Sequence, residues 1–490
     1  MHPTCPLIGI LLLSLSLRGY ANAAAVHTPD GAIRKLHELT LSARVRAPRT
    51  IAQWGAWASF QRHRLSIKYG SKDRLMKRGS GMNLLTNQNA DSSYFGSLVV
   101  GTPPVSYNVI LDTGSSDFWL ATTEALNHVD GNDPDDRFLP GYNPEASSSY
   151  VPLNRKFSIT YGSGGAAGVL GKEIVQMAGF TVQDQVMAVV SNMTEDMLSV
   201  PVSGLLGLGF PSIATSREIP FWLNVAAQPG VLDDAIMAFH LTRYLNDFDA
   251  RNAEPGGSFI FGGVNSSLFS GEIDFQDIPG GRVGYWIQTL TSIFCQGTPL
   301  QLPLVPQYAA IDTGTTLVGG PPTIIQQLYQ SIPGSERGIG DYDGYYTYPC
   351  ATTVSISLTF GNSSISWPIS PDDFKLAQLS SDTCLGAFFE FPTTNPNGPS
   401  WIIGDTFLKN VYSVFRAAPK PAVGFAQLSD LAKDMNGRGG ALPTPTYMDN
   451  GATVTAQDGL ARPTSGGSPL YAQLLTLFSA LISAIWLAAS

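Results

Sequence analysis

Charge, cysteine and histidine are all scarce in this chain of 490 residues. Only 14% of the residues are charged, whereas about a quarter is typical of soluble domains. The formal net charge of −9 argues against nucleic acid as a partner, because phosphate binding needs basic patches. Four cysteines are too few for a disulfide-dense scaffold, and their spacing matches no zinc site. The 50 glycines and 34 prolines instead favour a turn-rich β protein, and the length favours more than one folding unit.

Histidine-based chemistry is largely excluded. Only His128 and His240 of the six histidines lie beyond residue 78, so a three-histidine zinc centre there is impossible. The sequence has no His-Glu-x-x-His motif, no Gly-x-Ser-x-Gly nucleophile elbow and no Gly-x-x-x-x-Gly-Lys phosphate loop. We therefore expect no metal and no other cofactor, and we expect any catalysis to depend on carboxylates.

The N-terminal end is typical of a secreted precursor. An apolar block from Leu7 to Leu17 precedes the small-x-small pattern Ala21-Asn22-Ala23, and this block is too short to span a bilayer. Residues 1–23 are therefore predicted to be a signal peptide. Residues 24–78 carry 12 basic residues against 3 acidic ones and end in Lys77-Arg78. We predict that they form a propeptide cleaved after this dibasic pair, and the alternative is a disordered basic tail.

The C-terminal end predicts membrane attachment at the extracellular face. Residues 429–468 are rich in Gly, Pro, Ser and Thr, as expected of a flexible stalk, and residues 469–490 are largely apolar. Small residues before such a tail indicate a GPI-anchor signal, and Gly466 is the candidate attachment residue. A retained hydrophobic tail remains the alternative.

Two aspartates occur in matching contexts. An apolar run leads into Asp112-Thr113-Gly114-Ser115, and 200 residues later another leads into Asp312-Thr313-Gly314-Thr315. An apolar-apolar-Gly triplet follows each copy, Leu205-Leu206-Gly207 and Ile402-Ile403-Gly404. An Asp-Thr-Gly triplet occurs by chance about once in several thousand positions. The repeat therefore indicates an internal duplication in which each half supplies one aspartate.

Over about residues 90–428 the chain resembles the pepsin family of aspartic proteases. The resemblance includes both Asp-Thr-Gly motifs and four further segments, Phe157–Gly164, Phe259–Gly263, Gly284–Trp286 and Trp401–Asp405. It implies an all-β fold (mainly β with a few short helices) that has two pseudo-twofold-related lobes and the active-site cleft between them. We predict the lobes at residues 79–279 and 280–428. The two ends resemble those of the GPI-linked, yapsin-like fungal branch.

The family resemblance implies that Asp112 and Asp312 are the catalytic residues. Two carboxyls held within hydrogen-bonding distance cannot both ionise, so the pair shares a proton and can activate a water molecule. Flanking residues are expected to bond across the lobes, to orient the carboxyls and to let backbone N–H groups approach closely. These support residues are Thr113, Gly114, Ser115, Thr313, Gly314 and Thr315.

Tyr161, with Gly162 and Ser163 after it, resembles the tip of the flap hairpin that closes over substrate. Trp119 resembles the residue that hydrogen-bonds the flap tyrosine. Cys350 and Cys384 match the disulfide of the family's C-terminal lobe, which would stabilise the fold by about 3–4 kcal/mol, and Cys295 is left unpaired. N-glycosylation sequons occur at Asn192, Asn265 and Asn362.

Three features are open to more than one interpretation. The acidic segment within residues 121–142 is either a determinant of preference for basic substrate residues or a solvated loop. Lys68 in the propeptide either neutralises the catalytic carboxyls or is an ordinary basic residue. Arg416 stands where the family often has Asp, and a cation near Asp312 would alter the titration of the pair.

The sequence thus predicts a monomeric, secreted and surface-anchored aspartic endopeptidase with peptide substrates and its own propeptide as inhibitor. The alternative is a catalytically inactive pepsin-like binding protein at the cell surface. Inactive relatives usually lack an aspartate or the flap tyrosine, and this chain keeps Asp112, Asp312 and Tyr161.

Overall fold

The computed structural model describes residues 79–126, 141–195, 197–245, 247, 249–281, 283–393, 398–437 and 442–447. The predictions for the signal peptide, the propeptide with Lys68, Lys77 and Arg78, and the anchor residue Gly466 lie outside these residues. Most of the predicted stalk and most of the acidic segment also lie outside them. Within the described ranges the chain is mainly β with short helices, which confirms the predicted fold class.

The largest sheet in the described part of the chain has thirteen strands in the order β11-β25-β24-β9-β10-β1-β2-β3-β8-β4-β7-β6-β5. Its strands are β1 (Gly81–Gln88), β2 (Ser93–Val100), β3 (Val105–Asp112), β4 (Phe118–Ala121), β5 (Val151–Tyr161), β6 (Gly164–Met177), β7 (Phe180–Met193), β8 (Gly204–Gly207), β9 (Ile236–Leu241), β10 (Ala253–Phe261), β11 (Phe269–Asp277), β24 (Val411–Arg416) and β25 (Ala422–Leu428).

Two smaller sheets are built from residues 287–447. The first has the order β22-β15-β23-β14-β12-β18-β19-β26, with β13 also paired to β12, and the second has the order β16-β17-β21-β20. Their strands are β12 (Ile287–Cys295), β13 (Thr298–Pro299), β14 (Gln307–Ile311), β15 (Val318–Gly320), β16 (Glu336–Arg337), β17 (Tyr346–Pro349), β18 (Ile356–Phe360), β19 (Ile365–Ile369), β20 (Lys375–Gln378), β21 (Thr383–Gly386), β22 (Phe388–Glu390), β23 (Trp401–Ile403) and β26 (Thr446–Tyr447).

The helices are short and lie between strands. The α-helices are α2 (Thr123–Leu126), α3 (Phe221–Ala226), α4 (Pro322–Gln330), α5 (Pro371–Phe374), α6 (Asp405–Leu408) and α7 (Asp430–Lys433), and the 3₁₀ turns are η2 (Pro144–Ala146), η3 (Pro211–Ile213), η4 (Pro279–Gly281) and η5 (Gly340–Tyr342). In the part of the chain that the structure describes, none of the helices has the length and apolar character needed to cross a membrane.

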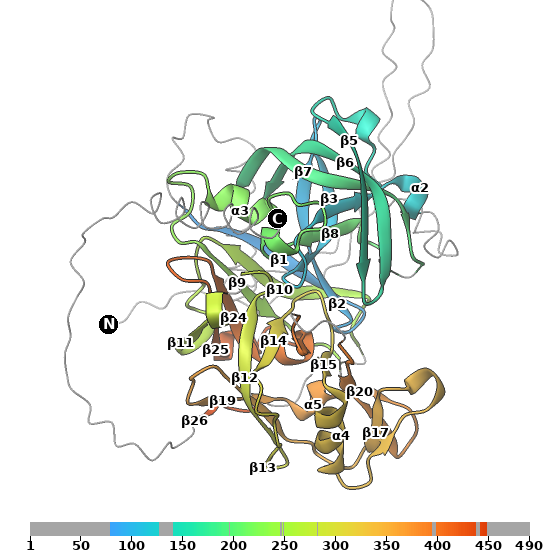
Figure 1. The fold of residues 1–490 in the computed structure, drawn as a ribbon, viewed down its shortest axis with the longest axis vertical. Coiled ribbons are helices and arrows are strands. Elements are labelled where there is room, and N and C mark those ends of the chain that lie inside the picture. The colour runs from blue at the N-terminus through green and yellow to red at the C-terminus, as the bar shows by residue number, and fades with distance from the viewer. Residues whose placement is uncertain are drawn as a thin grey trace, which may run out of the picture. The chain divides into compact units, whose positions relative to one another are not determined.

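The last long strands of the chain complete the large sheet. Strand β24 pairs antiparallel with β9 and with β25, and β25 pairs with β11. In Figure 1, β1, β9 and β10 lie between the strands β5–β7 on one side and β12, β17 and β19 on the other. Residues 411–428 therefore share a sheet with strands that precede residue 279, although we assigned them to the C-terminal lobe. The predicted boundary at residues 279 and 280 stays a prediction.

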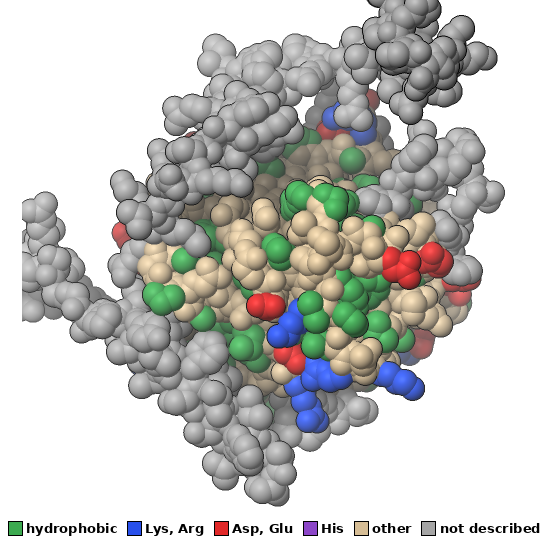
Figure 2. All heavy atoms as spheres, turned by 90° about the horizontal axis from the view of Figure 1, so that it is seen from above, with side chains coloured by type: hydrophobic (Ala, Val, Ile, Leu, Met, Phe, Trp, Pro, Cys, Tyr) green, Lys and Arg blue, Asp and Glu red, His purple; other side chains and the backbone are tan. Residues whose placement is uncertain are grey.

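The strands follow the alternation expected of half-buried β structure. In β1 the residues Gly81, Asn83 and Leu85 are buried and those between them are exposed. Strand β8, by contrast, is buried throughout. Charged side chains are few on the face shown in Figure 2, where uncharged polar and hydrophobic groups dominate around them. This surface agrees with the low charge content of the sequence.

Four buried charged side chains tie distant segments together. Lys409 Nζ lies 2.9 Å from Asp91 Oδ2 and 3.0 Å from Asp373 Oδ1, and Arg243 Nε donates to the same Asp373 oxygen at 3.0 Å. All four side chains are at most 4% exposed. Each buried charge therefore has an opposite charge beside it, and removing one partner would cost about 3–5 kcal/mol. The network fixes the turn after β1 to α5 and to the end of α6.

His240, near the end of β9, makes stability depend on pH. Its side chain is completely buried, and burial lowers its pKa to about 4, whereas an unfolded histidine titrates near 6.5. Below pH 6.5 the unfolded chain therefore binds a proton that the folded chain refuses. The stability contribution is complete above pH 6.5 and declines as the pH falls towards 4, by about 3 kcal/mol in total.

We predict that the free energy of unfolding falls less between pH 7 and pH 4 in His240→Leu than in the protein with His240. The measurement is the free energy of unfolding in denaturant at several pH values, made in an Asp112→Asn background to avoid self-cleavage. A loss of stability with falling pH that is the same with and without His240 would show that this histidine is not the cause.

Candidate active site

The two predicted aspartates occupy equivalent positions at the ends of two buried strands. Asp112 is the last residue of β3, which runs parallel to β8, and Asp312 follows β14, which runs parallel to β23. Strands β4 and β15 pair antiparallel with β8 and β23 in the same way. The internal duplication predicted from the sequence therefore appears as one local topology used twice.

A reciprocal exchange of hydrogen bonds joins the two motifs. The Thr113 amide donates to Thr313 Oγ1 at 3.1 Å, and the Thr313 amide donates to Thr113 Oγ1 at 3.0 Å. Each hydroxyl in turn donates across to the opposite strand, Thr113 to Ile311 O at 2.8 Å and Thr313 to Leu111 O at 2.6 Å. Both threonines are buried. The cross-lobe contact that the resemblance implied for these threonines is present in this geometry.

Each carboxyl is held by the two residues that follow its threonine. The Gly114 amide donates to Asp112 Oδ1 at 2.8 Å, and the Ser115 hydroxyl donates to Asp112 Oδ2 at 2.5 Å. The second motif repeats this arrangement: the Gly314 amide donates to Asp312 Oδ1 at 2.8 Å, and the Thr315 hydroxyl donates to Asp312 Oδ2 at 2.6 Å. Both carboxyl orientations are thereby fixed.

Positions 114 and 314 require glycine because each lies against the opposite aspartate and has no room for a side chain. A Cβ atom on Gly114 would clash with the carboxyl group of Asp312, and one on Gly314 would clash with that of Asp112. The absence of a side chain at both positions therefore lets the two carboxyls face each other across the pseudo-twofold axis.

The two carboxyls cannot ionise independently. Asp112 is 5% exposed and Asp312 is 8% exposed. Burial raises the pKa of Asp112 well above its usual range, and the charge of Asp312 and a hydrogen bond between the two side chains raise it further. The Ser115 hydroxyl and the Gly114 amide oppose this rise because they stabilise the carboxylate. The pair therefore retains a proton at a pH where isolated aspartates have lost theirs.

A hairpin places an aromatic hydroxyl near this pair. Strands β5 and β6 pair as far as Tyr161 and Gly164, which leaves Gly162 and Ser163 exposed at the tip. Trp119, buried in β4, donates its indole N–H to Tyr161 Oη at 2.9 Å. Burial raises the pKa of Tyr161, and the charge of Asp112 adds to this rise. The phenol is therefore neutral and can donate its proton in a hydrogen bond near the pair.

Trp286 supports both aspartates from behind, a role that the sequence reasoning missed. Its buried indole N–H donates to Leu208 O at 2.9 Å, and the Leu208 amide donates to Asp112 O at 2.7 Å. Its own carbonyl accepts from Ile311 N at 2.9 Å, directly before Asp312. The only sequence signal was its place in Gly284–Trp286, a segment that we used for the family resemblance alone.

Asp405, the first residue of α6, is a further buried carboxyl that the sequence reasoning did not single out. Burial raises its pKa well above the usual range, Lys409 opposes this shift, and the charges of Asp312 and Asp112 add to it. The carboxyl is therefore kept neutral beside the pair. The only sequence signal was its place at the end of Trp401–Asp405, a segment that we used for the family resemblance alone.

The remaining predicted residues lie away from the pair. Cys350, directly after β17, and Cys384, in the neighbouring strand β21, form the predicted disulfide with their Cα atoms 5.0 Å apart. Cys295 is free and buried. Arg416 is engaged elsewhere: its guanidinium lies 4.4 Å from the ring centroid of Phe275 and pairs with Asp277 at 3.2 Å. Arg416 is not among the groups that shift the pKa of Asp112.

The three predicted glycosylation sequons lie near strand ends or in a turn. Asn192 is the last residue but one of β7, Asn265 follows β10, and Asn362 lies in the turn between β18 and β19. Among the described residues, no group of three or more His, Cys, Asp or Glu side chains is arranged to hold a metal ion.

Comparisons with known proteins agree with this geometry. The family model described as eukaryotic aspartyl protease matches residues 93–428. Major aspartyl peptidase 1 of Cryptococcus neoformans var. grubii is 40% identical over 361 residues, which cover 72% of this chain and 72% of the relative. Cathepsin E of Mus musculus is 33% identical over 329 residues (66% and 78% of the two chains), and pepsin A of Sus scrofa is 30% identical over 332 residues (67% and 80%). The chain belongs to the pepsin-like family of eukaryotic aspartyl proteases.

Proposed function

We propose that the protein is an aspartic endopeptidase in which Asp112 and Asp312 together activate a water molecule. The observation that carries the proposal is the pair of reciprocally anchored carboxyls, in which the pKa of Asp112 is raised by burial and by the charge of Asp312. A pair that shares one proton holds a base and an acid at the same place.

The proposed reaction uses both members of the pair in one step. The ionised carboxylate takes a proton from the water, and the water oxygen attacks the carbonyl carbon of the peptide bond. The protonated carboxyl gives its proton to the carbonyl oxygen, which yields a neutral tetrahedral diol. Transfer of a proton to the amide nitrogen then breaks the C–N bond and releases an acid and an amine. No covalent bond forms between enzyme and substrate.

Other parts of the molecule would bind and protect this reaction. The hairpin tip at Tyr161–Gly164 would close over a peptide substrate, with Trp119 holding Tyr161 in place. We also propose that the basic propeptide inhibits the enzyme until cleavage after Arg78. A pepsin-like binding protein without activity is the rival, and the intact pair and flap tyrosine argue against it.

The two ends of the sequence support a location at the extracellular face of the membrane. We propose that the protein enters the secretory pathway, is glycosylated and is held at the extracellular face by a GPI anchor, as in the yapsin-like branch. The support is the order of the segments: an apolar leader, a dibasic site, a Gly- and Pro-rich stretch and an apolar tail.

We predict that Asp112→Asn and Asp312→Asn each lower kcat/KM for peptide hydrolysis by about 10³-fold or more, because neither variant can share a proton between two carboxyls. The measurement is cleavage of a protein substrate across acid and neutral pH, with and without pepstatin. Asp277→Asn is the matched control, since Asp277 is half-exposed and pairs with Arg416 and Lys420. Activity that survives both substitutions and pepstatin would disprove the mechanism. A pure wild-type protein that cleaves nothing would favour the rival.

Ser115→Ala is expected to move the alkaline limb of the pH profile upwards. The Ser115 hydroxyl lowers the pKa of Asp112 by stabilising its carboxylate, so its removal raises that pKa and the pair keeps its proton to higher pH. The profile of kcat/KM against pH measures this shift. Ser116→Ala is the matched control because the Ser116 hydroxyl donates to Phe210 O instead. An unchanged or lowered limb would contradict the assignment.

Phosphatidylinositol-specific phospholipase C cuts the lipid from a GPI anchor. We therefore expect that treating intact cells with this phospholipase releases the mature protein into the medium. The measurement is the amount of protein in the medium before and after treatment. Protein that stays with the membrane and still contains residues 469–490 by mass spectrometry would show that the tail is retained instead.

A further inference from the structure

A shallow trough lies on the outer face of the flap hairpin. Three adjacent strands form it, and Ser158 of β5, Ala167 of β6 and Asn192 of β7 stand in one cross-strand row. A second row, nearer the tip, contains Thr160 and Gly165 with Thr194 beside them. The trough has a volume of about 310 Å³, which is the size of the smallest small-molecule sites.

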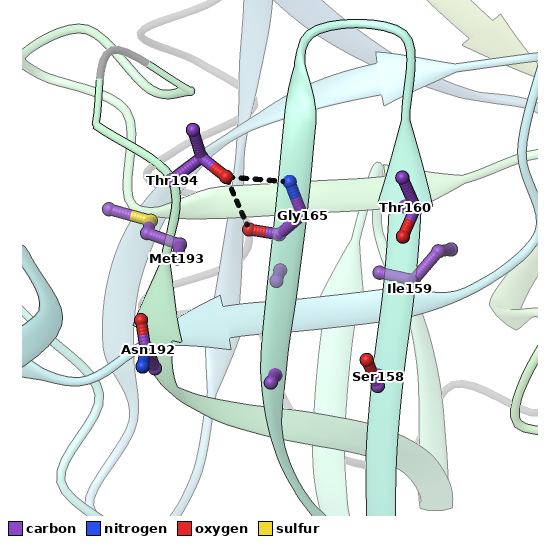
Figure 3. A pocket seen from close by; sticks show the side chains of 9 residues that line it. Ser158, Ile159, Thr160, Gly165, Asn192, Met193 and Thr194 are labelled. Carbon is purple, nitrogen blue, oxygen red and sulfur yellow. Dashed lines mark hydrogen bonds between the residues drawn. The ribbon is translucent and has the colours of Figure 1, made fainter.

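Polar side chains line the two long sides of the trough, and residues with little or no side chain form its base. Figure 3 shows Ser158 and Thr160 on one strand, Asn192 on another with Thr194 just after its end, and Gly165 on the strand between them. The floor is low because Gly165 has no side chain and Ala167 carries only a methyl group. Hydroxyl and amide groups facing each other over small apolar residues are suited to a sugar ring, which has polar edges and less polar faces.

The trough contains its own attachment point for a sugar. Asn192-Met193-Thr194 is an N-glycosylation sequon, and all three residues line the trough. Asn192 is exposed, and its side chain makes no hydrogen bond to any part of the chain that the structure describes. Asn265 differs, since its Oδ1 accepts from the amide and hydroxyl of Ser267 at 3.1 and 2.7 Å.

Thr194 connects this sequon to the flap. Its hydroxyl accepts from Gly165 N at 2.9 Å, and its amide donates to Gly165 O at 2.9 Å. Gly165 lies one residue from Gly164, where the hairpin turns, and a Cβ atom on Gly164 would clash with Thr194. Tyr161 and Gly164 form the next cross-strand pair after Thr160 and Gly165. Any group seated in the trough therefore lies directly behind the flap tip.

We propose that an N-linked glycan on Asn192 seats its first N-acetylglucosamine in this trough and braces the flap hairpin from outside. The inference rests on the proposed secretion and on the proposed flap. The sugar spans from β7 across β6 to β5, and it lies on the exposed side of the hairpin that carries the side chains of Ser158 and Thr160. It thereby restricts outward movement of the hairpin and favours the conformation that closes over substrate.

The experiment compares protein secreted from a glycosylating eukaryotic host with its Asn192→Gln variant, both in an Asp112→Asn background. Mass spectrometry measures the occupancy of Asn192, and hydrogen–deuterium exchange measures the opening of residues 157–166. We expect Asn192 to be glycosylated and exchange in this segment to rise about tenfold in the variant. Asn362→Gln, which removes a sequon outside the hairpin, is the matched control and is expected to leave this exchange unchanged.

Enzymatic trimming tests the role of the first sugar on one purified protein. Endoglycosidase H leaves one N-acetylglucosamine on folded protein, so slow exchange is expected to persist. Peptide N-glycosidase F removes the whole glycan and converts Asn192 to Asp, and exchange is expected to rise as in Asn192→Gln. In protein with an intact Asp112, loss of the sugar is expected to raise KM about 2–5-fold with kcat within about twofold, because closure of the flap over substrate is weakened.

An unoccupied Asn192, or flap exchange that is independent of the sugar, would overturn the proposal. The exchange measurement needs no activity, so a protein that cleaves nothing but shows the expected exchange would refute the proposed protease function and leave the glycan brace in place.

Discussion

The reciprocal bonds between Thr113 and Thr313 are the constraint on which the rest of the site depends. They hold two chain segments 200 residues apart in register, and each threonine hydroxyl also reaches the strand that carries the opposite aspartate. Neither half could build the site alone, because the carboxyl of each aspartate packs against the glycine of the other motif. The symmetry of the fold is thus the means by which two like charges are brought together.

The molecule treats its buried charges in two different ways. Asp91 and Asp373 lie against Lys409, and Asp373 also against Arg243, so their negative charges are compensated. Burial raises the pKa of Asp112 and of Asp405, and neighbouring carboxyls add to the rise, which Lys409 opposes at Asp405 without cancelling it. Paired charges hold chain segments together, and carboxyls with a raised pKa keep their protons. The balance of burial and neighbouring cations therefore decides which carboxyls are ionised and which hold a proton.

Short sequence motifs predicted the parts of the site that are built from residues close together in the chain. The Asp-Thr-Gly motifs could be predicted because each is a short pattern that occurs twice, and the family resemblance implied the roles of their flanking hydroxyls and of the Tyr161 hairpin. Trp286, Asp405 and the partners of Arg416 could not, since their roles depend on which distant strands become neighbours. The insertion of β24 and β25 into the large sheet escaped prediction for the same reason: hydrophobic alternation indicates a strand but not its partner.

The place of β24 in the large sheet also constrains how the chain folds as it is made. Strand β9 has β10 on one edge and β24 on the other, and residues 411–416 are synthesised long after residues 236–241. During that interval the edge of β9 has no partner from its own sheet, and such an edge can pair with another chain. The sheet is complete only once nearly all of the protease domain has left the ribosome. A nascent chain halted before Val411 would therefore expose the unpaired edge of β9, and it would be prone to aggregate through that edge.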